Sequence, residues 1–156
     1  MIPTLGHLAV VIGLVATLYA AGAFAIAGVR GDRAVLASAR YAIYAAFGLV
    51  ALACLAMVVS LLTHDFSVRY VARNNATTTP PFYSVISLWA ALEGSILFWT
   101  LLATGWAGLV LHRYRDRLPV LMPWVGATLA LGLAFFFAVM AWPGDPFVRI
   151  TPVGVE

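Results

Sequence analysis

One carboxylate, Glu93, lies inside an apolar stretch at about residues 85–111, and it is the side chain best suited to chemistry. In a continuous helix it would lie about 12 Å from the outer end. A charge at that depth costs roughly 2.5–3.5 kcal/mol, so we expect it to face protein or water. Two roles stay open: a cofactor- or proton-linked group, or a buried acid paired with an arginine or with helix backbone. The small residues Gly94 and Ser95 would let a neighboring helix approach closely.

Two tryptophans flank this carboxylate, Trp89 and Trp99. Trp89 lies four residues before Glu93 and would share its helix face. Indole rings offer a flat surface for a porphyrin or a quinone, but they are also common anchors at the membrane interface. We favor anchoring for Trp89. Trp99 and Trp106 would lie deeper, and we expect them to pack against helices.

Three histidines are the other candidate ligands, and all lie at the ends of apolar runs. His7 and His64 are expected at the same membrane surface, where they could ligate a metal or heme. His112 is expected at the opposite surface. A bis-histidine cytochrome needs facing histidines inside its bundle, so interfacial histidines without a ligand role are the favored interpretation. The sequence has no CxxC, heme-attachment or Walker motif, so it predicts neither a catalytic residue nor a metal site in this chain.

The composition indicates the element that must position these residues, which is the membrane-spanning helix. Of 156 residues, 63% are hydrophobic and 10% are charged, against roughly 25% charged in a soluble domain. The basic residues form short clusters between apolar runs rather than a stripe on a water-soluble face, which excludes a nucleic-acid partner. Membrane lipid is the expected surroundings.

Four apolar runs are long enough to cross a bilayer, which takes roughly 20 residues. Because lipid cannot satisfy peptide groups, each run should be helical. The sequence therefore predicts an all-α integral membrane protein, with residues 1–156 forming a single transmembrane module. The expected helices cover about residues 5–29, 41–62, 85–111 and 120–142. The polar segment 64–84 would be an outer loop, extended at 65–71 and turn-rich at 74–81.

The charges of the connections predict the orientation. The segments after the first and third runs hold six arginines and two acidic residues, whereas the opposite side holds three of each. Arginine-rich loops stay on the cytoplasmic side. We therefore expect both termini to lie outside.

Several stretches together resemble the N-terminal region of the CcmF family of cytochrome c heme lyases. They are the start Met1–His7, the segment Asp65–Ala72 followed by Asn74-Asn75, the segment Trp89–Trp99, and the closing Asp145–Arg149. The third is similar to the family's Trp-Gly-x-His-Glu-Gly-Ser-Leu-Leu-Leu-Trp. This chain departs from it at two places, with Ala90 in place of the glycine and Leu92 in place of the histidine.

The resemblance implies a multi-pass protein of the bacterial inner membrane that acts in cytochrome c maturation. The complete protein would take heme from a periplasmic heme chaperone and attach it to apocytochrome c, together with other maturation subunits. The family's heme-handling segment lies downstream of residue 156, so this chain looks like the N-terminal fragment of a longer protein. Its four helices would be scaffold and partner surface for the remainder of the lyase. We expect no stoichiometric heme on this chain alone.

Two other classes remain as alternatives. A small membrane scaffold or quinone-linked subunit of a respiratory complex would use Glu93 and the tryptophans for proton or quinone contact. Half of a transporter would use Glu93 to line a substrate path. The transporter is the least favored, because the sequence shows no pair of interrupted helices at corresponding positions.

Overall fold

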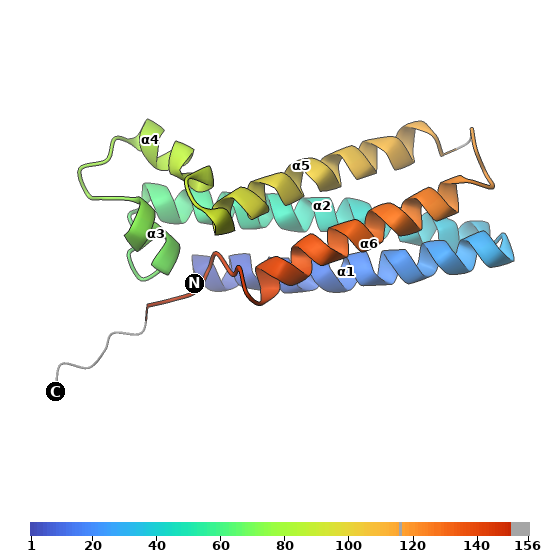
Figure 1. Ribbon diagram of the computed structural model, residues 1–156, viewed down its shortest axis with the longest axis horizontal. Helices are drawn as coiled ribbons and strands as arrows, with labels where there is room; N and C mark the ends of the chain where they lie inside the picture. The colour runs from blue at the N-terminus through green and yellow to red at the C-terminus, as the bar shows by residue number, and fades with distance from the viewer. Residues whose placement is uncertain (116, 151–156) are drawn as a thin grey trace.

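The computed structural model describes residues 1–115 and 117–150, and four long helices form a bundle (Figure 1). They are α1 (Ile2–Arg30), α2 (Arg33–Leu62), α5 (Leu92–Arg113) and α6 (Met122–Ala141). All four are long and apolar enough to cross a membrane. Within the described residues, the only β-type pairing is one isolated bridge. The prediction of an all-α protein with about four membrane-spanning helices is therefore confirmed.

The first connection is much shorter than expected, because α2 begins at Arg33 rather than near residue 41. Gly31 ends α1 in the left-handed conformation, with φ 68°, and its N–H donates to the carbonyl of Ala27 at 2.8 Å. Asp32 then caps α2, because its side chain accepts from the N–H groups of Ala34 and Val35. The two caps reduce the turn to two residues.

The segment between α2 and α5 is more helical than expected. It holds α3 (Arg69–Asn74), α4 (Pro81–Ile86) and the short 3-10 helix η1 (Ser87–Trp89). The expectation of an extended stretch at 65–71 is wrong for its last residues, which form the first turns of α3. The expected helix 85–111 is also interrupted, because Ala91 is extended, with φ −132° and ψ 170°. The third long helix therefore begins at Leu92.

The bundle core depends on rings that fill the space above glycines. α1 packs against both α2 and α6, and α2 packs against α5. Between α1 and α6, the buried ring of Phe137 lies over Gly13, and the buried ring of Phe24 lies over Gly126. A Cβ at Gly126 would lie only 2.6 Å from the Phe24 ring. Each helix thus supplies one ring and one glycine, which brings their backbones close together.

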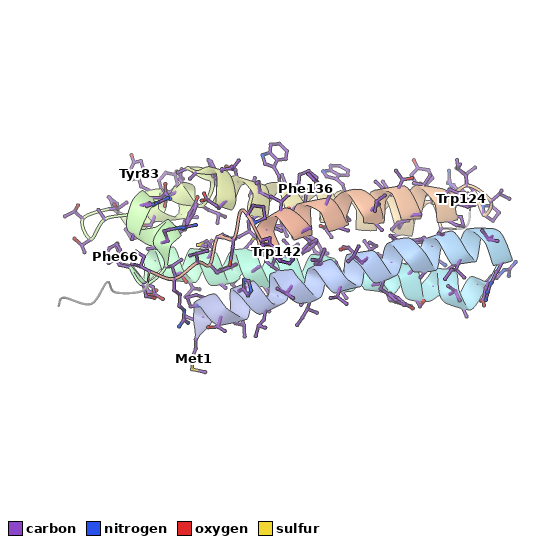
Figure 2. The ribbon with its side chains drawn as sticks, turned by 60° about the horizontal axis from the view of Figure 1, so that its bottom comes forward. Met1, Phe66, Tyr83, Trp124, Phe136 and Trp142 are labelled. Atoms are coloured by element: carbon purple, nitrogen blue, oxygen red, sulfur yellow. The ribbon has the colours of Figure 1, made fainter. Side chains whose placement is uncertain are left out.

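The two ends of the bundle differ. The start of α1, the helices α3 and α4, and the described residues after α6 lie at one end (Figure 1). The connections from α1 to α2 and from α5 to α6 lie at the other. In Figure 2, Phe66 and Tyr83 mark the first end and Trp124 marks the second. We call the first end the connector end and the second the turn end.

The ring-over-glycine packing gives a testable consequence. Gly13→Ala should lower the stability of the bundle by about 1–3 kcal/mol, because the added methyl group would overlap the Phe137 ring. Gly22→Ala is the matched control on the same helix, since nothing lies within 4 Å of a Cβ there. It should leave stability unchanged or raise it. Thermal unfolding in detergent measures both, and equal melting temperatures for the two variants would contradict this packing.

Candidate functional site

The connector end is held together by contacts between segments far apart in the sequence. The residues after α6 run antiparallel to those before α3, so that the N–H of Arg69 donates to the carbonyl of Val148 at 2.8 Å. The N–H of Ile150 donates to the carbonyl of Ser67 at 2.9 Å. The guanidinium of Arg149 donates to Thr4 Oγ1 on α1 at 2.8 Å. Hydrogen bonds thus join the start of α1, the segment around α3 and the described residues after α6.

Tyr70 organizes the interruption before α5. Its buried hydroxyl lies 2.9 Å from the carbonyl oxygens of both Ser87 and Leu88, to which it donates, and it accepts from the N–H of Ala91 at 3.4 Å. The Ser87 carbonyl also accepts from the N–H of Ala90 at 3.2 Å, so the Leu88 carbonyl and the Ala91 N–H depend most on the hydroxyl. Burial raises the pKa of the Tyr70 hydroxyl above its ordinary value of 10.0; the negative charge of Glu93 adds to the rise, and the hydrogen bond from Ala91 opposes it. The hydroxyl therefore stays protonated and able to donate at neutral pH.

Gly94 and Ser95 also contact the interrupted segment before α5. A Cβ at Gly94 would overlap the Leu88 carbonyl oxygen and the Tyr70 hydroxyl, so only glycine fits there without a shift. Ser95 Oγ donates to the carbonyl of Trp89 at 3.0 Å. Gly94 thus contacts the short helix α3 and η1, and Ser95 bonds to η1.

Glu93 lies at the connector end in the first turn of α5, not deep within a continuous helix. The expected continuous helix is wrong here, because Ala91 interrupts it two residues before Glu93. The same interruption puts Trp89 and Glu93 on different helical segments, so they do not share a helix face. A carboxylate in the first turn interacts favorably with the helix dipole, and the side chain of Glu93 is half-buried.

Glu93 faces a small cavity of about 100 Å³ that two cations and a second carboxylate also line. Its lining residues are Arg69, Tyr70, Arg73, Asn74, Ala91, Glu93 and Asp145. Arg69 and Arg73 are one helical turn apart on α3, so both face the cavity from the same side. Sequence reasoning missed the arginines and Tyr70. The four-residue spacing of the arginines was the available signal, but it required knowing that 69–74 is helical.

The histidines do not form a shared site. His7 Nδ1 lies 2.9 Å from a carboxylate oxygen of Asp145. The His64 ring packs edge-on against Phe66, with ring centers 6.0 Å apart. His112 lies on α5 at the turn end. In the described part of the chain, no group of three His, Cys, Asp or Glu residues is arranged to hold a metal ion.

The tryptophans lie on the outside of the bundle. Trp89 is half-exposed and packs against Phe98, with ring centers 5.5 Å apart. Trp99 and Trp106 are 63% and 66% exposed, so the expectation that they pack against helices is wrong. Trp142, after α6, is exposed as well (Figure 2). None of these rings encloses a pocket for a flat cofactor with Glu93.

Comparison with known proteins places this arrangement in a family. No protein-family profile matches the chain. "Cytochrome c-type biogenesis protein CcmF" of Pseudomonas aeruginosa is 34% identical over 152 residues, which is 97% of this chain and 23% of the relative. The protein of the same description from Escherichia coli K12 is 34% identical over 97% of this chain and 24% of the relative. A solved structure, "Cytochrome c Heme Lyase CcmF", superposes with a TM-score of 0.87 at 38% identity, over 97% of this chain and 26% of that one.

The bundle of four apolar helices and these similarities define a multi-pass membrane protein of the cytochrome c-type biogenesis class. The chain belongs to the CcmF family and corresponds to the N-terminal portion of its members. It spans about a quarter of the length of the relatives that it matches.

The Tyr70 contacts predict a local loss of structure. Tyr70→Phe removes the hydroxyl that pairs the Leu88 carbonyl and the Ala91 N–H, which should cost about 1–3 kcal/mol. Faster amide hydrogen exchange at residues 87–95, with α1 and α6 unchanged, would show it. Tyr83→Phe, on the exposed face of α4, is the matched control and should exchange as the unmodified chain does. Identical exchange in both variants would contradict the role of Tyr70.

The raised pKa of Tyr70 also predicts how the hydrogen-exchange protection of residues 87–95 depends on pH. The stabilization by the protonated hydroxyl is fully present below the unfolded value of 10.0 and is lost as the pH rises through the higher folded pKa. The protection of residues 87–95 should therefore fall at strongly alkaline pH in the unmodified chain.

Proposed function

We propose that this chain is a membrane component of cytochrome c maturation in the bacterial inner membrane, where it forms the N-terminal part of a heme lyase. The observation that carries the proposal is the likeness to CcmF proteins across 97% of the chain in both sequence and structure. It also favors this function over a quinone-linked or scaffold subunit of a respiratory complex.

Within that machinery, these helices would act as scaffold and partner surface. Hydrogen bonds join the segments of the connector end, which presents charged and aromatic side chains together. Trp89 and Leu92, which are close in sequence to the cavity residues Ala91 and Glu93, are exposed and would suit a protein partner. The partners that we propose are the remainder of the lyase, a periplasmic heme chaperone, apocytochrome c and other maturation subunits.

Heme is the cofactor that we propose for the complete protein, and the described residues of this chain fit it poorly. His7 already contacts Asp145, His64 packs against Phe66, and the third histidine lies at the other end. Position 92, where the resemblance places a histidine, is an exposed leucine at the start of α5. We therefore assign no heme ligand here, and the absence of stoichiometric heme on this chain alone stays a prediction.

The charge distribution supports a connector end on the periplasmic side. The turn end carries the arginine clusters, with Arg30, Arg33 and Arg113 exposed there. Arginine-rich turns are retained in the cytoplasm. Asp116 and Glu156, which we counted from the sequence, lie outside the described residues.

Site-directed labeling tests this orientation. In a Cys54→Ala background, Thr78→Cys at the connector end should react with a membrane-impermeant maleimide added from the periplasmic side. Ala34→Cys at the turn end should react only after the membrane is opened, because α2 begins there on the cytoplasmic side. Both substituted residues are exposed. Labeling of Ala34→Cys in intact cells would overturn the topology.

A chimera tests the function. This chain would replace the matching segment of the Pseudomonas aeruginosa relative in a strain that lacks that relative, and heme staining would measure mature c-type cytochromes. We expect maturation to be restored. In the same chimera, Glu93→Gln should lower maturation about tenfold at unchanged protein abundance, because it removes a negative charge from the cavity surface and a loss of about 1.4 kcal/mol in partner binding is tenfold.

The control is Glu93→Asp, which keeps the charge and should retain most of the maturation. A loss of abundance in Glu93→Gln would show instead that the carboxylate only balances the arginines of the cavity. Normal maturation at normal abundance would show that Glu93 has no role. A chimera that accumulates in the membrane but matures no cytochrome would refute the proposed function itself.

A further inference from the structure

An open apolar groove runs along the outside of the bundle between α2 and α5. It consists of two adjoining cavities of about 460 and 430 Å³ that share Phe47, Gly105 and Leu109. Its walls also include Ala51, Leu101 and the exposed ring of Trp106. We call this the α2/α5 groove. It lies on two helices that are long and apolar enough to cross a membrane.

Glycines on α5 form the floor of the groove. A Cβ at Gly105 would lie 3.1 Å from the Phe47 ring, and one at Gly108 would lie 3.5 Å from the Tyr44 ring. The two glycines are three residues apart and so follow one face of α5. The aromatic rings of α2 rest against this floor, and the exposed Leu109 and Trp106 rise on its far side. The result is a long, shallow channel with apolar walls.

The groove opens toward the turn end into a basic pocket of about 460 Å³. Tyr44 and His112 line both this pocket and the groove, so the two are continuous. The other lining residues of the pocket are Ala37, Arg40, Tyr41 and Arg115. Among the described residues, none that lines this pocket is acidic. An apolar channel in the membrane is thus joined to a cationic, hydroxyl-bearing pocket at the level of the headgroups.

We propose that the groove and its basic pocket bind one anionic phospholipid, with the phosphate beside Arg40 and His112 and an acyl chain along the α2/α5 groove. The guanidinium of Arg40 and a ring N–H of His112 can donate to a phosphate, and the tyrosine hydroxyls can donate to its remaining oxygens. Basic pockets between transmembrane helices on the cytoplasmic side commonly bind anionic headgroups. The lining of the groove is mostly apolar, which matches an acyl chain. This inference does not depend on the proposed function.

Tryptophan quenching by brominated lipids tests it, because Trp106 lines the groove. The other tryptophans, Trp89, Trp99, Trp124 and Trp142, would be replaced by phenylalanine. The full chain would be placed in phosphatidylcholine nanodiscs with a small fraction of brominated phosphatidylglycerol or, in parallel, brominated phosphatidylcholine. We expect the anionic lipid to reach Trp106 with about fivefold higher apparent affinity, the effect of about one basic residue beside an anionic headgroup.

Variants identify the pocket. Arg40→Gln combined with His112→Gln should abolish the preference for the anionic lipid while general quenching by either lipid remains. Arg33→Gln is the matched control, because Arg33 is on the same helix but does not line the pocket. Equal quenching by the two lipids in the unmodified chain would overturn the proposal. So would a preference that survives the double substitution, or a Trp106 that neither lipid reaches because another helix or a second copy covers the groove.

Discussion

Inside a bilayer, every backbone N–H and C=O group must find its partner within the protein, because hydrocarbon offers none. Within the four long helices the backbone satisfies this constraint by itself, except at the helix ends. The interruption before α5 does not, and the chain meets the constraint there with side chains: the Tyr70 hydroxyl bonds to the carbonyls of Ser87 and Leu88, and Ser95 bonds to that of Trp89. The shape of the connector end follows from this local solution.

Apolar runs were sufficient to predict the four helices, whereas their ends depended on weaker signals. The start of α2 was missed because the charged residues Arg33 and Arg40 look like a loop in a hydrophobicity pattern. Gly31 followed by Asp32 was the better signal, since it reads as the end of one helix and the cap of the next. No such signal marks the interruption at Ala91, because alanine is the best helix former. The interruption is bonded instead by Tyr70, which is distant in sequence.

The candidate site was only partly predictable for the same reason. Glu93, Gly94 and Ser95 stood out in the sequence, but their position at the bundle end followed from the contact with α3. The sequence also could not predict which side of α5 carries Trp99 and Trp106. α5 is apolar nearly all round, so periodicity could not tell which side faces neighboring helices and which faces lipid.

The short pairing between the residues after α6 and those before α3 couples two regions mechanically. Arg69 takes part in it through its backbone and lines the Glu93 cavity with its side chain. Asp145 likewise lines the cavity and holds His7 of α1. A displacement of the chain at the exit from α6 therefore reshapes the cavity wall directly. A force on the chain at this exit would therefore be transmitted to the charged residues that line the cavity.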